Sequence, residues 1–328
     1  MNLDVTLVRG DPYMPAAFLI HGLGMDKRIW ESPDKSRVLG GSFPISFLLN
    51  REPGNIETRD ARRKLFLGEG VNNLTTLFHS LKERKYTVIT WSQRRPSAEV
   101  EIAVSELRYL TAAYEKYCGS GIVLIGHSRG GLVARKYLAY GDTRVRAMIT
   151  LASPHMGSGM ARWAEYISPL TSLVASLLPY SERGTLTYVV RRVLDFLGSR
   201  AVKELLPDSC FFRSLDDARI KGVQYISVGG KNPTLFSVYR GVVGTKDKDD
   251  RFIMKSQKIF SVPGIFEKVI PAKLFPDELK QGKGDGLVST ESSKLPWAGE
   301  HHDFDLNHAA LLFDEGVKKT VVDALCKL

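Results

Sequence analysis

Short runs of apolar residues alternate along the chain with segments whose apolar residues recur every three or four positions. The short runs are rich in Val, Ile, Leu and Phe, as expected of strands buried on both faces of a parallel sheet. They predict strands at Val5–Val8, Ala16–Ile20, Thr87–Thr90, Ile122–Ile125, Ala147–Leu151 and Gln224–Val228. The other segments predict helices at about 73–84, 98–117, 130–140 and 312–325. This alternation predicts an α/β protein with a mainly parallel sheet and helices on both faces.

Three stretches interrupt this alternation. Residues 31–70 carry several Gly and Pro and a basic run, and they predict an insertion of loops and short helices. Residues 240–284 are of mixed character and give no assignment. In the third stretch, residues 156–207, apolar residues recur at helical spacing from Trp163 to Leu178 and from Val189 to Leu197. These two segments predict amphipathic helices with broad apolar stripes.

The predicted organisation is a core interrupted by a helical lid or cap. The expected parts are residues 1–155 and 208–328 for the core and 156–207 for the lid, with insertions at about 31–70 and 240–284. A lid of this kind would cover the site when closed and expose an apolar patch when open. The alternative is an ordinary cap that packs on the core and shapes a pocket.

The stretch "VLIGHSRGGLVARKYLAY" starts as a buried strand and ends as a helix, with Ser128 at the corner. It matches the pattern G-x-S-x-G in its strand-to-helix context. Side chains at Gly126 and Gly130 would collide in so tight a turn. The turn is expected to strain Ser128 and lift its hydroxyl above the sheet edge. Arg129 is then expected to be the first residue of a helix. Its backbone N–H would lie at the helix N-terminus, where a negative charge that develops during a reaction is stabilised.

A serine nucleophile needs a base, and the base needs an orienting acid. In proteins where a G-x-S-x-G turn joins a strand to a helix in this way, the acid and then the histidine follow the serine along the chain. The segment "HHDFDLNH" contains three histidines in that position, and "GKGDGLVST" upstream of it contains one aspartate. The candidates are therefore His301, His302 and His308 for the base and Asp285 for the acid.

Several motifs together resemble α/β-hydrolase lipases and esterases, in particular bacterial triacylglycerol lipases. "GHSRGGLVAR" resembles the nucleophile elbow, "HGLGM" the oxyanion loop, "LASPHMGS" the segment before the lid and "GDGLVS" the acid loop. "NHAAL" resembles the histidine loop, and residues 203–230 resemble the stretch that follows the lid. The motifs occur in the order found in the family.

The resemblance implies a catalytic triad of Ser128, Asp285 and His308, with His302 as the rival base. It also implies an oxyanion hole formed by the backbone N–H groups of Leu23 and Arg129. His21 then has a structural role in the oxyanion turn. The implied chemistry is hydrolysis of carboxylic esters, including lipid or acylglycerol esters, through an acyl-enzyme and without a cofactor.

A metal site is not expected. Some lipases of the family hold calcium beside the histidine loop, but Asp303 and Asp305 are interpreted here as solvated loop acids. The same triad could also serve a phospholipase, a thioesterase or an acyltransferase. A non-catalytic binding protein with the hydrolase fold is the alternative from another class.

Composition and charge bear on partners and location. The 328 residues carry a net charge of +10 and a pI of about 9.4, yet no nucleic-acid motif accompanies the basic residues. The expected partners are a small-molecule or lipid ester and a membrane or lipid interface met by the lid, not nucleic acid. The N-terminus lacks the basic start and apolar core of a signal peptide, and three cysteines suit a reducing compartment. The expected location is the cytoplasm.

Overall fold

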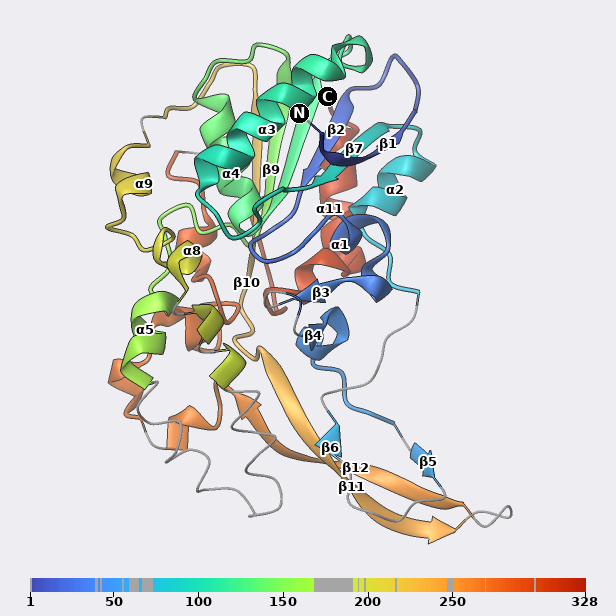
Figure 1. The fold of residues 1–328 in the computed structure, drawn as a ribbon, viewed down its shortest axis with the longest axis vertical. Helices are drawn as coiled ribbons and strands as arrows, with labels where there is room; N and C mark the ends of the chain where they lie inside the picture. Colours follow the sequence, from blue (N-terminus) through green and yellow to red (C-terminus); the bar gives the residue numbers. More distant parts are fainter. Residues whose placement is uncertain are drawn as a thin grey trace.

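A seven-stranded sheet forms the centre of the protein in this computed structural model (Figure 1). The order of its strands is β1-β7-β2-β8-β9-β10-β13, and all neighbours are parallel except β1 and β7. The strands are β1 (Asp4–Val8), β2 (Ala16–Ile20), β7 (Thr87–Ser92), β8 (Ile122–His127), β9 (Val145–Leu151), β10 (Gln224–Gly230) and β13 (Glu300–Phe304). The structure describes residues 2–38, 41, 43–54, 56–58, 65–66, 73–167, 191–193, 195–197, 199–215, 217–246, 251–268, 270–297 and 299–328.

The six strands predicted from apolar runs are all present, extended by at most two residues at an end. Every residue of β2 and of β8 is buried, as the continuous apolar runs require. The seventh strand, β13, was not predicted. Its sequence, EHHDF, is polar because this strand lies at the edge of the sheet and, among the described strands, pairs with β10 alone.

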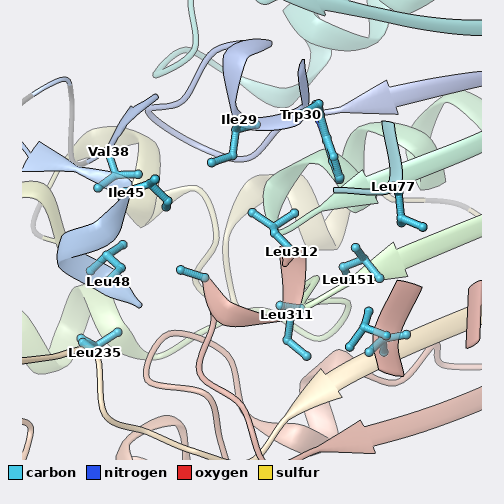
Figure 2. Packing of buried hydrophobic residues seen from close by; sticks show 14 of the residues in the cluster. Ile29, Trp30, Val38, Ile45, Leu48, Leu77, Leu151, Leu235, Leu311 and Leu312 are labelled. Atoms are coloured by element: carbon cyan, nitrogen blue, oxygen red, sulfur yellow. The ribbon is translucent and has the colours of Figure 1, made fainter. Parts of the chain in front are cut away.

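Helices cover both faces of the sheet, as predicted. One apolar cluster joins the sheet to α3 (Val100–Ala113) and α4 (Arg129–Leu138). The opposite cluster joins it to α1 (Arg28–Glu31), α2 (Leu77–Glu83) and α11 (Glu315–Leu325). Figure 2 shows part of this second cluster, where Trp30, Leu77 and Leu311 come from distant parts of the chain.

Two helices start later than the apolar pattern suggests, because capping residues set their first turns. Thr76 caps α2, where its side chain accepts a hydrogen bond from the backbone of Phe78 and the side chain of His79 returns to the Thr76 N–H. The Asp314 side chain accepts from the Val317 N–H and caps α11. The capping residues Thr76 and Asp314 therefore set where α2 and α11 begin.

Residues of the two insertions meet in a second, antiparallel sheet of order β5-β12-β11-β6, which extends away from the central sheet in Figure 1. Its long strands are β11 (Phe236–Lys246) and β12 (Phe252–Val262), and its short ones are β5 (Ile56–Thr58) and β6 (Leu65–Phe66). A third pair, β3 (Arg37–Val38) and β4 (Phe43–Pro44), also lies in the first insertion. The prediction of only loops and short helices for 31–70 was therefore incomplete.

The remaining elements are short. They are α9 (Cys210–Arg213), α10 (Thr290–Ser293) and 3-10 turns at Pro33–Lys35, Ile45–Leu48, Glu115–Tyr117, Phe266–Lys268, Ala272–Leu274, Asp277–Leu279 and Ala310–Leu312. The predicted lid begins with α5 (Met160–Ile167) and ends with α8 (Arg200–Lys203), while residues 168–190 lie outside the described residues. Within the described part of the chain, none of the helices has the length and apolar character needed to cross a membrane.

Candidate active site

The carboxyl ends of the parallel strands meet at one edge of the sheet, and the predicted site residues lie there. His21 to Leu23 follow β2, Ser128 follows β8, and His308 follows β13. Open α/β sheets bind their ligands at this edge. The fold therefore brings together segments that are far apart in the sequence, such as those of Leu23 and His308, which line one cavity.

Ser128 occupies a sharp turn between β8 and α4. Its φ of 54° and ψ of −127° place it in a region that L-residues rarely adopt. Its N–H donates to the Leu151 carbonyl over 2.8 Å, which ties the turn to the neighbouring strand. A Cβ at Gly126 would lie 2.4 Å from the backbone of Gly130, and one at Gly130 would lie 2.3 Å from the Ile20 oxygen. The predicted strained turn is present, and only glycine fits on either side of it.

Asp285 and His308 are bonded to each other below the surface. Nδ1 of His308 lies 2.9 Å from Oδ2 of Asp285, and these side chains are 5% and 1% exposed. Oδ1 of Asp285 accepts from the backbone N–H groups of Leu287 and Val288 over 2.9 and 2.8 Å. An ionised carboxylate can only accept, so the proton of a neutral His308 is on Nδ1. Nε2 of His308 is then left as a base.

One cavity joins Ser128 to His308. It encloses about 630 Å³ of empty space, including the part open to solvent, and Leu23 also lines it. Apart from Ser128, Ser158 and His308, its described lining is apolar. The Ser158 hydroxyl donates to the Leu287 carbonyl over 2.7 Å, so it is already engaged. Ser128 is the lining hydroxyl suited to react.

His302, the rival base, lies on β13, where its Nε2 is 2.7 Å from Oε1 of Glu300. His301 on the same strand contacts Ser227 and Asp303. Asp303, interpreted from the sequence as a loop acid, lies on the same strand, which corrects that expectation. The described lining of the cavity includes His308 and neither of these two.

His127, next to Ser128 in the sequence, is fully buried and bonded to the backbone. Its Nε2 donates to the His308 carbonyl over 3.1 Å, and the two rings lie 4.9 Å apart between centroids. Burial, and then the nearby His308, lower the pKa of His127 to about 3. His127 therefore stays neutral and supports the loop that carries His308.

The two expected oxyanion donors lie on segments that touch. Leu23 lines the cavity, and a Cβ on Gly22 would come 3.1 Å from the Ser128 Cβ. Arg129 is the first residue of α4, so the helix itself cannot satisfy its backbone N–H. A feature that the sequence did not indicate is Gln93, which links the side chain of Arg129 to His21. Nothing in the pattern around Gln93 distinguishes it from a surface loop residue.

Among the described residues, no group of three or more His, Cys, Asp or Glu side chains is arranged to hold a metal ion. Asp303 accepts from His301 over 3.0 Å, and Asp305 lies 3.4 Å from the amide nitrogen of Gln281. Both aspartates are thus engaged with protein groups.

Comparisons with known proteins agree with this architecture. Residues 75–219, less than half of the chain, match the family model described as palmitoyl protein thioesterase. The mature form of the lipase BlEst2 from Bacillus licheniformis superposes with a TM-score of 0.53 at 15% identity, covering 98% of this chain and 97% of that one. The propeptide form of the same lipase gives 0.53 at 14% identity, covering 99% of this chain and 53% of that one. No curated protein sequence matches the chain.

Proposed function

Since the chain has the α/β-hydrolase fold, as its sequence predicts, we propose that it is a serine hydrolase of carboxylic esters. Ser128 is the nucleophile, His308 the general base and Asp285 the acid that orients the base. The observation that carries this proposal is that Ser128 and His308 line one apolar cavity while His308 is bonded to Asp285.

The proposed reaction is acyl transfer to water. Nε2 of His308 takes the proton from the Ser128 hydroxyl, and the oxygen attacks the ester carbonyl. The N–H groups of Leu23 and Arg129 stabilise the resulting oxyanion. His308 returns the proton to the leaving alcohol, and an acyl-enzyme forms. A water molecule activated by His308 then releases the acid and restores Ser128.

The cavity favours an apolar acyl group, as in a lipid or acylglycerol ester. A second apolar hollow of about 300 Å³ adjoins it, and both are lined by Met160 and Leu197. Trp163 and Phe266 line the second hollow, where their rings meet edge to face with centroids 5.4 Å apart. A chain that starts at Ser128 could extend past Met160 into this space. Contact with a lipid interface through the lid stays a prediction, because residues 168–190 lie outside the described part.

Thioester hydrolysis is the second candidate, favoured by the match to the palmitoyl protein thioesterase model. The matched residues include Ser128 but neither Asp285 nor His308. Esters and thioesters both react through a tetrahedral intermediate with an oxyanion, so the same residues serve either substrate. The two activities differ in the leaving group, which is an alcohol for an ester and a thiol for a thioester.

The test compares oxygen esters and thioesters that share an acyl chain. Wild-type protein and Ser128→Ala would be assayed on p-nitrophenyl esters from C2 to C16 and on S-acyl thioesters of the same lengths. We expect hydrolysis by the wild type only, with the largest kcat/KM on a long chain. A kcat/KM at least tenfold higher on the thioester series would assign the thioesterase activity. Equal activity of Ser128→Ala would contradict both.

A further inference from the structure

Arg129 places its charged side chain inside the protein, next to the proposed nucleophile. The residue is 0% exposed. Its Nη1 donates to the Ala98 carbonyl over 2.6 Å, and its Nη2 donates to Oε1 of Gln93 over 2.7 Å. Burial lowers the pKa of Arg129 to about 10, so the guanidinium is still charged at neutral pH.

Gln93 connects Arg129 to His21 through two further hydrogen bonds. The Gln93 N–H lies 3.1 Å from Nε2 of His21, and the Gln93 side-chain amide donates to the His21 carbonyl over 3.1 Å. Since a backbone N–H can only donate, Nε2 of His21 is the acceptor and Nδ1 carries the proton. Nδ1 lies 2.9 Å from the Gly22 carbonyl and therefore donates to it. Burial lowers the pKa of His21 to about 4, which keeps the ring neutral in this arrangement.

The Gly22 carbonyl belongs to the same peptide unit as the Leu23 N–H. A trans peptide is planar, and its C=O and N–H point in opposite directions. A hydrogen bond that holds the Gly22 oxygen therefore also fixes the direction of the Leu23 N–H. Leu23 lines the cavity that contains Ser128, and Gly22 lies beside Ser128.

We propose that Arg129 is a positioning residue for the oxyanion hole. Its backbone N–H is one of the two donors. Its side chain, acting through Gln93 and His21, sets the direction of the other donor at Leu23. One residue thus fixes the two donors relative to each other. This inference rests on the proposed function and adds to it the groups that preorganise the hole.

Arg135 provides a matched control on the same helix. It is also buried, but its Nη2 binds Oδ1 of Asp217 over 2.9 Å and its Nη1 binds the His155 carbonyl. Arg135 thus pairs with a carboxylate. Arg129 instead donates to two neutral oxygens, and its bond to one of them, Oε1 of Gln93, orients the Gln93 side chain. Loss of Arg135 should affect stability without affecting the oxyanion loop.

Two substitutions interrupt, each at a different residue, the hydrogen bonds that connect Arg129, Gln93 and His21. Arg129→Met removes the guanidinium. Gln93→Glu keeps an acceptor for Arg129 but removes the amide N–H that holds the His21 carbonyl. Each variant and Arg135→Met would be assayed with p-nitrophenyl butyrate, and rates would be divided by the concentration of serine titrated with a fluorophosphonate. A trifluoromethyl ketone of the same acyl length, which forms an oxyanion on the serine, would report on the hole directly.

We expect Arg129→Met and Gln93→Glu to lower kcat by about 10- to 100-fold, somewhat less than removal of a whole donor, with KM within about threefold of the wild type. The affinity for the trifluoromethyl ketone should fall by the same factor as kcat/KM. Arg135→Met should lower the melting temperature and leave kcat per titrated serine within about twofold. If Arg129→Met does not fold, Gln93→Glu decides the question, because it leaves the buried charge paired.

The outcomes separate this inference from the function on which it rests. A wild-type protein that neither hydrolyses the ester nor reacts with the fluorophosphonate would show that the proposed function is wrong. An active wild type, with kcat per titrated serine and ketone affinity unchanged in both variants, would overturn the positioning role alone. Losses in these two variants that match the loss in Arg135→Met would overturn it too, because they would reflect general stability.

Discussion

His308 and Asp285 are joined by two hydrogen bonds, one between side chains and one between backbones. Nδ1 of His308 lies 2.9 Å from Oδ2 of Asp285, and the His308 N–H donates to the Asp285 carbonyl over 3.0 Å. The backbone bond fixes the distance between the two loops, and the side-chain bond fixes the orientation of the His308 ring. The geometry therefore supports a role for Asp285 in choosing the tautomer of His308.

Asp285→Asn should reduce kcat at least about a thousandfold, as measured with a p-nitrophenyl ester. The Asn oxygen can still accept from Leu287 and Val288, which turns its NH₂ group toward Nδ1 of His308. Nδ1 must then act as an acceptor, so the proton moves to Nε2 and His308 cannot take a proton from Ser128. The fold should be retained.

His302→Ala is the control for the choice of base, because His302 is bonded to Glu300 on β13. This variant should stay within about threefold of wild-type activity, whereas His308→Ala should lose at least about a thousandfold. The reverse result would show that His302 is the base.

Ser128 can be tested with two variants that separate chemistry from strain. Ser128→Ala and Ser128→Gly should both lose ester hydrolysis by at least about a thousandfold, because both lack the hydroxyl of the proposed nucleophile. Only Ser128→Gly should raise the free energy of unfolding, by about 1 kcal/mol, since glycine adopts a φ of 54° without strain. Urea unfolding measures this difference. Equal stability of the two variants would mean that the turn stores little strain.

The sequence predicted the central sheet and the elbow because their physical requirements leave local patterns. Strands such as Ala16–Ile20 are buried on both faces and must be apolar throughout. The elbow needs glycine at positions 126 and 130, where any side chain would meet backbone atoms. Such constraints are visible in a few consecutive residues.

Features that depend on distant partners left no such pattern. β13 is polar because it is an edge strand, and its partner β10 is about 70 positions away. β12 is only partly buried, and the hairpin of β11 and β12 pairs with residues of the first insertion, so its mixed sequence pattern gave no assignment. Gln93 acquires its proposed role from its contacts with Arg129 and His21, which leave no local sequence pattern.

Two buried histidines should make the protein less stable in mild acid. Burial lowers the pKa of His127 to about 3 and that of His21 to about 4, against an ordinary value near 6.5. Between pH 6.5 and 4 the unfolded chain binds these protons and the folded chain does not. The free energy of unfolding should therefore fall as the pH falls through this window, by about 1.4 kcal/mol per pH unit for each histidine. Above pH 6.5 neither group contributes to the pH dependence.

His127→Phe tests this account, because it keeps an aromatic ring and removes one titrating group. The free energy of unfolding, measured with urea from pH 7.5 to 4, should fall less steeply in the variant than in the wild type. The loss of the hydrogen bond to His308 lowers stability at every pH and does not change the slope. Parallel curves for the two proteins would show that His127 does not titrate as described.

The acyl chain should pass Met160, which lines both the main cavity and the second hollow. Met160→Phe puts a stiffer and bulkier side chain there and should exclude the end of a long chain. Each methylene that loses its apolar contact costs about 0.8 kcal/mol, so the loss of three costs roughly 2.4 kcal/mol, a factor of about 60 in kcat/KM. Hydrolysis of the C16 p-nitrophenyl ester should fall by about that factor, while hydrolysis of the C4 ester, which has the shorter chain, should change little.

Met148→Phe is the matched control, because Met148 is equally buried but packs on the opposite face of the sheet with α3 and α4. Both substitutions overpack a core and should lower the melting temperature by similar amounts. Only Met160→Phe should change the ratio of C16 to C4 activity. A uniform loss on both esters would mean that the chain does not pass Met160, and the second hollow would then be ordinary core. In that case the preferred substrate would be a short-chain ester, because the space beside Ser128 would end at Met160 and Leu197.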